Sequence, residues 1–176
     1  MAQDLSVPAH RVPAVVLAGG DDASGLASML ADLLTDNVRD FPWRARVASR
    51  ARGSVVLRAA DHDLEVTVTF LGDCVEITDG AAEGVTTVSG PWLAMAQLCS
   101  GQLSAVQAVR RGELAVRLGH HLPAAAAAGF VLSVPESFYA EGEPAPDRRS
   151  AVAVGAVVVA AVAVGVAVVV RRRTSM

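Results

Sequence analysis

Residues 64–70 read LEVTVTF, and this stretch decides the class of fold. Its apolar side chains are Leu64, Val66, Val68 and Phe70, and each is separated from the next by Glu or Thr. An alternation with a period of two places the two sets on opposite faces of a β-strand. Residues 64–70 are therefore predicted to form a strand that has one buried face and one polar face.

Further strands are predicted on both sides of this one. Residues 55–60 alternate in the same way and lead into it through the polar turn Asp61-His62-Asp63. After the turn Gly72-Asp73 come two more short strands, at residues 75–77 and 85–88, and a fifth is predicted at residues 114–118. Strands joined by such short connections pair antiparallel. We therefore expect a five-stranded, mainly antiparallel sheet.

Helical periodicity flanks these strands. Leu26, Leu30, Leu34 and Val38 share one stripe, which is typical of an amphipathic helix, and Pro42 ends it. A second short helix is predicted over residues 43–51. Its exposed side is expected to carry the arginines Arg44, Arg46, Arg50 and Arg52. Helices are also predicted after Gly90-Pro91, after Ser104, and from Pro123 to Leu132, so the fold class is α+β, with helices covering the sheet.

Residues 151–170 contain only Val, Ala and Gly. Twenty helical residues span about 30 Å, which is the thickness of the hydrocarbon core of a bilayer. Arg148 and Arg149 precede the run and Arg171–Arg173 follow it, so both ends can reach the headgroup layers. We predict a single transmembrane helix here and a bilayer as a partner.

The chain is accordingly divided into five parts. Residues 1–20 are interpreted as a flexible leader, 21–134 as the folded domain, 135–150 as a linker, 151–170 as the transmembrane helix and 171–176 as a basic tail. No signal peptide is recognisable near Asp4 and Pro13. The arginine count on the two sides of the span is nearly equal, so the lack of a signal decides the orientation. We expect a tail-anchored, single-pass protein whose soluble domain is cytoplasmic.

The charge balance argues against nucleic acid as a partner. The formal net charge is −3, and without Arg171, Arg172 and Arg173 the remaining residues 1–170 carry −6. Binding to nucleic acid needs a basic surface. All 15 basic residues are Arg, which together with the abundant Ala, Val and Gly fits the codon bias of a GC-rich, bacterial genome.

No motif for catalysis, a metal or a cofactor is present in the sequence. The chain lacks a nucleophile elbow, a phosphate-binding loop, a dinucleotide fingerprint and a zinc-protease motif. His120 and His121 are adjacent, so in a strand they would point to opposite faces and chelate poorly. Cys74 and Cys99 have no metal-ligand spacing and are expected to be buried thiols. We expect neither an enzyme nor a cofactor.

The stretch from Val88 to Leu118 carries a more specific signal. Within it, Leu98-Cys-Ser-Gly-Gln-Leu103 leads to Arg111-Gly-Glu-Leu-Ala-Val116. This pattern resembles the sterol carrier protein type-two domain, the sterol-binding, non-specific lipid-transfer family, and the resemblance covers roughly residues 22–132. The sequence departs from the family pattern in having Gln102 and Glu113 where basic residues are usual, and Gly119-His120-His121 where the family has Gly-Asp.

The resemblance implies an apolar tunnel between sheet and helices that holds a lipid-like ligand, sterol-like or fatty acyl. Ten apolar residues are candidates to line it. They are Val66, Val68, Phe70, Trp92, Met95, Leu98, Leu103, Val106, Leu114 and Val116. The function expected is non-enzymatic binding or transfer of such a ligand by a membrane-anchored domain. The alternative is a membrane-tethered protein-interaction or scaffold module whose core is filled and whose protein partner is unknown.

Overall fold

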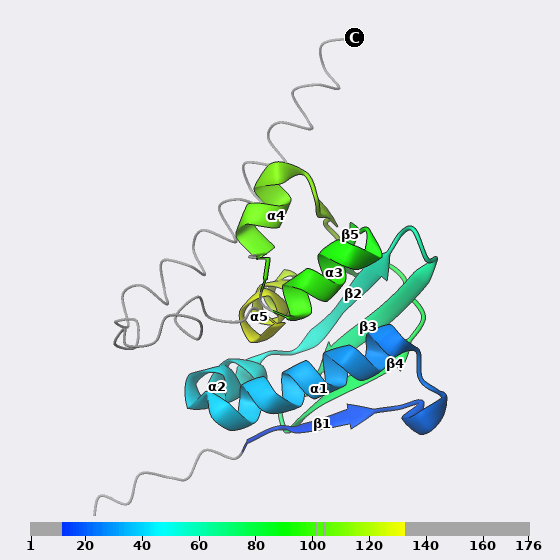
Figure 1. The fold of residues 1–176 in the computed structure, drawn as a ribbon. Coiled ribbons are helices and arrows are strands. Elements are labelled where there is room, and N and C mark those ends of the chain that lie inside the picture. Colours follow the sequence, from blue (N-terminus) through cyan, green and yellow to red (C-terminus); the bar gives the residue numbers. More distant parts are fainter. Residues whose placement is uncertain (1–11, 101, 104, 133–176) are drawn as a thin grey trace, which may run out of the picture.

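The computed structural model describes residues 12–100, 102–103 and 105–132 (Figure 1). The strands are β1 (Ala14–Leu17), β2 (Gly53–Ala59), β3 (Leu64–Phe70), β4 (Cys74–Asp79), β5 (Thr86–Gly90) and β6 (Ala115–Arg117). The helices are η1 (Gly20–Asp22), which is a 3-10 turn, α1 (Gly25–Asp40), α2 (Pro42–Arg50), α3 (Trp92–Cys99), α4 (Ala105–Arg111) and α5 (Leu122–Leu132). The α+β class and the helices expected from the periodicity are confirmed.

The described strands form one mixed sheet in the order β1-β4-β3-β2-β5-β6. Antiparallel pairing joins β2 to β3, β3 to β4 and β5 to β6, whereas β1 pairs parallel to β4 and β5 pairs parallel to β2. The expectation of five mainly antiparallel strands is therefore corrected in two places, at β1 and at β5.

Strand β1 lies in the stretch that the sequence assigned to a flexible leader. Val15 and Leu17 pack against the core, and each is paired in register with a buried residue of β4. Pro13 immediately precedes the strand, where its missing N–H costs no ladder hydrogen bond. The proline and the nearby Gly19-Gly20 suggested an irregular segment, but the free edge of β4 supplies the partner that makes residues 14–17 a strand.

Strand β5 does not pair with β4, although only residues 80–85 connect them. Six extended residues reach about 20 Å, enough to pass over the two intervening strands, which are about 4.8 Å apart. The crossing segment is held on the polar face of the sheet, where the Thr67 hydroxyl donates to the carbonyl of Gly80 (2.7 Å) and accepts from the N–H of Ala82 (3.1 Å). A short connection can therefore join parallel strands here, which the rule for hairpins does not anticipate.

The helices cover one face of the sheet. Helix α1 packs on β1, β3 and β4, and α5 packs beside it on β2 and β3 (Figure 1). The face below them carries the apolar set of the alternating strands, including Val66, Val68 and Phe70, all fully buried. The predicted two-faced strand at residues 64–70 is thus confirmed, and the core lies between the sheet and the helical layer.

Helix α2 corrects one further expectation. Its arginines were all placed on the exposed side, but the Arg44 residue is only 1% exposed. Arg46, Arg50 and Arg52 are exposed, as expected. Two ring contacts account for the burial of Arg44, because its guanidinium carbon lies 4.8 Å from the centre of the Phe41 ring and 5.0 Å from that of Trp43.

Candidate functional site

Most of the ten candidate ligand residues are brought together in the core. Val66, Val68, Phe70, Met95, Leu98, Leu103 and Leu114 are buried and belong to one apolar cluster, and Trp92 packs against it. Val116 on β6 is half-buried and pairs with Val88 instead. The side chain of Val106 lies outside the described residues. The sequence thus identified one contiguous interior, and the role of these residues in binding stays a prediction.

The stretch that carries the family resemblance forms a compact unit at one side of this interior. Helix α3 ends at Cys99, the chain steps to Leu103, and α4 follows. Gly112 then adopts a φ of +74°, which glycine tolerates best, and turns the chain into β6. Leu103 and Leu114, the two leucines of the pattern, are both buried in the core. The spacing read from the sequence therefore corresponds to two helices followed by a strand.

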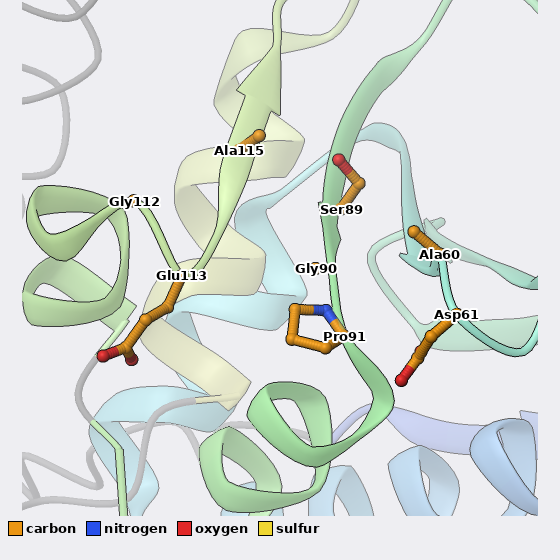
Figure 2. A pocket seen from close by; sticks show the side chains of 8 residues that line it. All are labelled: Ala60, Asp61, Ser89, Gly90, Pro91, Gly112, Glu113 and Ala115. Atoms are coloured by element: carbon orange, nitrogen blue, oxygen red, sulfur yellow. The ribbon is translucent and has the colours of Figure 1, made fainter.

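A separate, open hollow of about 470 Å³ lies at the end of β2 and β5 (Figure 2). Its lining comes from three segments of the chain: Ala60 and Asp61; Ser89, Gly90 and Pro91; and Gly112, Glu113 and Ala115. None of the ten candidate residues lines it. No local pattern in the sequence marks this hollow, because it arises where three chain segments meet.

The charged groups of the hollow are two carboxylates, which flank Pro91 in Figure 2. Asp61 accepts a hydrogen bond from the backbone N–H of Trp92 at 2.6 Å, at the start of α3. Glu113 lies 3.9 Å from a guanidinium nitrogen of Arg111. Both carboxylates are thus engaged in local contacts. The hollow is also open to solvent, so an acyl chain placed in it would stay largely in contact with water.

Arg44 is the strongest electrostatic feature of the interior. Among the described residues, its Nε and Nη1 atoms are buried and have no hydrogen-bond partner. Burial alone lowers the pKa of Arg44 to about 10, so the side chain remains protonated at neutral pH. The sequence predicted that this residue lies on the exposed face of its helix. The one signal for its burial was the presence of two aromatic residues, Phe41 and Trp43, within three positions of it.

His121 and Cys99, which the sequence offered as possible metal or thiol sites, have structural contacts or are buried. His121 accepts a hydrogen bond at Nδ1 from the N–H of Ser54 (3.3 Å). Burial raises the pKa of the Cys99 thiol to about 12, which leaves it without a nucleophilic thiolate at neutral pH. Over the ranges that the structure describes, no group of three or more His, Cys, Asp or Glu side chains is placed to hold a metal ion.

The predicted transmembrane helix, residues 151–170, lies outside the described residues, as do the linker 135–150 and the tail 171–176. Among the helices in the described part of the chain, none is long and apolar enough to cross a bilayer. The membrane anchor therefore stays a prediction from the sequence.

No protein-family model matches the chain, and no curated protein matches it. Several solved structures are similar in fold. UbiJ-SCP2 Ubiquinone synthesis protein has 17% identity and a TM-score of 0.46, with 60% of this chain and 89% of that chain covered. A structure of sterol carrier protein 2 has 18% identity and a TM-score of 0.44, with 62% and 92% covered. The conserved hypothetical protein TT1886 from Thermus thermophilus has 18% identity and a TM-score of 0.40, with 65% and 92% covered.

Proposed function

We propose that the chain binds an apolar, lipid-like ligand, sterol-like or fatty acyl, and carries it without a chemical step. The observation that carries this proposal is the placement of residues 98–116. The stretch that resembles the sterol carrier type-two pattern forms α3, α4 and β6, and its leucines Leu103 and Leu114 are buried in the apolar core. The ligand would be held non-covalently between the sheet and the helices, in the interior to which most of the ten candidate residues belong.

Burial of apolar area supplies the binding free energy in this proposal. Each Å² of hydrocarbon removed from water is worth about 25 cal/mol, and specificity comes from the shape of the site. Among the residues proposed to contact the ligand are Leu103, which belongs to the buried core, and Trp92, which packs against it.

The site of action proposed is the surface of a bilayer. The support for it is the uninterrupted apolar run at residues 151–170, flanked by arginines on both sides. A tail anchor with the domain on the cytoplasmic side would keep the carrier within the reach of its 135–150 linker, so that the ligand travels only a short distance to and from the membrane.

A second candidate function is a membrane-tethered interaction module with a filled core. It is favoured by the complete burial of Val66, Val68 and Phe70 and by the position of the open hollow, which none of the ten candidate residues lines. In this case the interior serves only stability, because side chains at native density leave no room for a ligand.

Photocrosslinking on the full chain discriminates between the two. The protein, reconstituted in nanodiscs, is incubated with palmitate that bears a diazirine in its chain, irradiated, digested and mapped by mass spectrometry. We expect labelled peptides from residues 64–70 and 92–103, and competition by unlabelled palmitate. Labelling confined to residues 151–170, or no labelling at all, would contradict the carrier and leave the filled module.

A further inference from the structure

Arg44 is almost fully buried, and two of its donor nitrogens have no acceptor among the described residues. A guanidinium carries five N–H donors. A buried donor without an acceptor loses its hydrogen bonds to water and gains none in return, which destabilises the folded state. The Arg44 residue is 1% exposed, and its Nε and Nη1 find no acceptor among the described residues. The pKa of Arg44 is lowered by burial with no opposing contribution from a carboxylate, so no described internal anion balances the charge.

The position of Arg44 on its helix adds to this cost. Phe41 is the N-cap of α2 and provides no side-chain hydrogen bond to the first turn. The N-terminus of a helix carries a partial positive charge, which disfavours a cation in the first turn and favours an anion. Arg44 lies in that first turn, behind Pro42. The first turn of α2 contains no acidic residue, so no carboxylate of that turn balances the charge of Arg44.

The aromatic rings hold the guanidinium but do not satisfy its donors. The Phe41 and Trp43 rings contact it through their faces, and Trp43 meets Phe130 of α5 edge-on, with ring centres 6.5 Å apart. These contacts hold the guanidinium by its faces and leave Nε and Nη1 without an acceptor among the described residues.

Helix α2 also borders the apolar interior. Ala45 and Ala48, on the same helix, belong to the core cluster, as do Val131 and Leu132 at the end of α5. Arg44 therefore belongs to a helix that packs directly on the apolar interior.

We propose that Arg44 binds the anionic head group of the ligand, so that the preferred ligand is an acidic amphiphile, carrying a carboxylate or a phosphate, rather than a neutral sterol or alcohol. This inference rests on the proposed function, which supplies the apolar part of the ligand. An anionic oxygen that accepts from Nε or from Nη1 gives a buried donor the charge-assisted partner that the described residues do not supply.

The test compares three photoactivatable probes on the full chain in nanodiscs: palmitate, hexadecanol and phosphatidate, each with the diazirine in its hydrocarbon chain. Labelling of peptides from the core is measured against probe concentration. We expect wild type to prefer an acid over hexadecanol by roughly 10- to 100-fold, the range for a charge-assisted hydrogen-bond pair. Arg44→Gln should lose this preference and label with hexadecanol as before. The palmitate and phosphatidate arms show which acid supplies the anion.

Arg46→Gln is the matched control, because it removes the same charge from an exposed position of the same helix. It should keep the preference for the acid. Arg44→Lys retains the charge and loses the fork of donors, so it should keep only part of the preference. Arg44→Met removes an unbalanced buried charge and should raise the thermal midpoint of the ligand-free protein, which also shows that loss of binding is not loss of folding.

Three results would count against the inference, and they differ in what they contradict. Equal labelling of the core by acid and alcohol, unchanged in Arg44→Gln, leaves the carrier intact and removes the role of Arg44. Absence of core labelling by all three probes contradicts the carrier itself and the inference with it. A lower thermal midpoint for Arg44→Met would identify the ring contacts of Arg44 as structural and would likewise count against a ligand.

Discussion

Asn37 of α1 donates a hydrogen bond from its Nδ2 atom to the carbonyl oxygen of Val131 in α5, at 2.7 Å and across 94 residues of sequence. Both residues are buried, with Asn37 only 4% exposed. The bond satisfies a carbonyl in the last turn of α5, where helices lack internal partners. It therefore ties the last described helix to α1 at the edge of the core.

Replacing Asn37 with Ala should destabilise the fold. The change leaves the buried Val131 carbonyl without a donor among the described residues, which costs about 1–3 kcal/mol of unfolding free energy. Thr35→Ala, at an exposed position of the same helix, should change it by less than about 0.5 kcal/mol. Urea unfolding of both variants tests this, and equal stabilities would show that the bond between α1 and α5 contributes nothing.

Gly119 is required by a close approach of two backbones. A Cβ at this position would overlap the carbonyl groups of Gly84 and Val85, which belong to the segment leading into β5. Because backbone cannot move aside as a flexible side chain can, Gly119→Ala should cost about 1–3 kcal/mol.

Gly25 provides the opposite case, since a Cβ there meets nothing within 4 Å. Gly25→Ala, in the first turn of α1, should raise the unfolding free energy by about 0.4–1 kcal/mol through a less disordered unfolded chain. Thermal denaturation of the two variants should therefore shift in opposite directions, and a shift of the same sign in both would refute the steric argument.

Cys99 should be inert towards alkylating reagents in the native protein. Burial raises its pKa to about 12, above the ordinary value near 9, so at about pH 8 the thiol form prevails and access is blocked. Cys74 is only half-buried and should react first with iodoacetamide. In a Cys74→Ser background, labelling of Cys99 should follow global unfolding in urea, and rapid labelling without denaturant would disprove this.

Asp61 stabilises the start of α3 from outside the helix. Pro91 is the N-cap and makes no side-chain hydrogen bond, and the carboxylate of Asp61 accepts from the Trp92 N–H instead. Asp61→Ala should lower the unfolding free energy by about 0.5–2 kcal/mol, as the loss of a helix cap does. Urea unfolding measures this loss. Asp61→Asn retains an acceptor and should lose less, whereas equal losses would point to charge rather than to the hydrogen bond.

The sequence by itself determined the local elements, because their signals are local. The alternation at residues 64–70 specified β3 and its buried face, and the stripe from Leu26 to Val38 specified α1. The leucines Leu103 and Leu114 could be assigned to the core for the same reason, since periodicity reports which side of an element avoids water.

Only the tertiary structure decided how the elements meet. Strand β1 pairs with the free edge of β4, and β5 pairs parallel to β2 after a crossing segment that is hydrogen-bonded to Thr67. Arg44 likewise looked exposed by its helical position, and it is buried because Phe41 and Trp43 lie against it. The pairing of β1, the crossing before β5 and the burial of Arg44 depend on residues distant in the chain or on the geometry of aromatic rings. Hydrophobic periodicity is a local signal and reports neither of these.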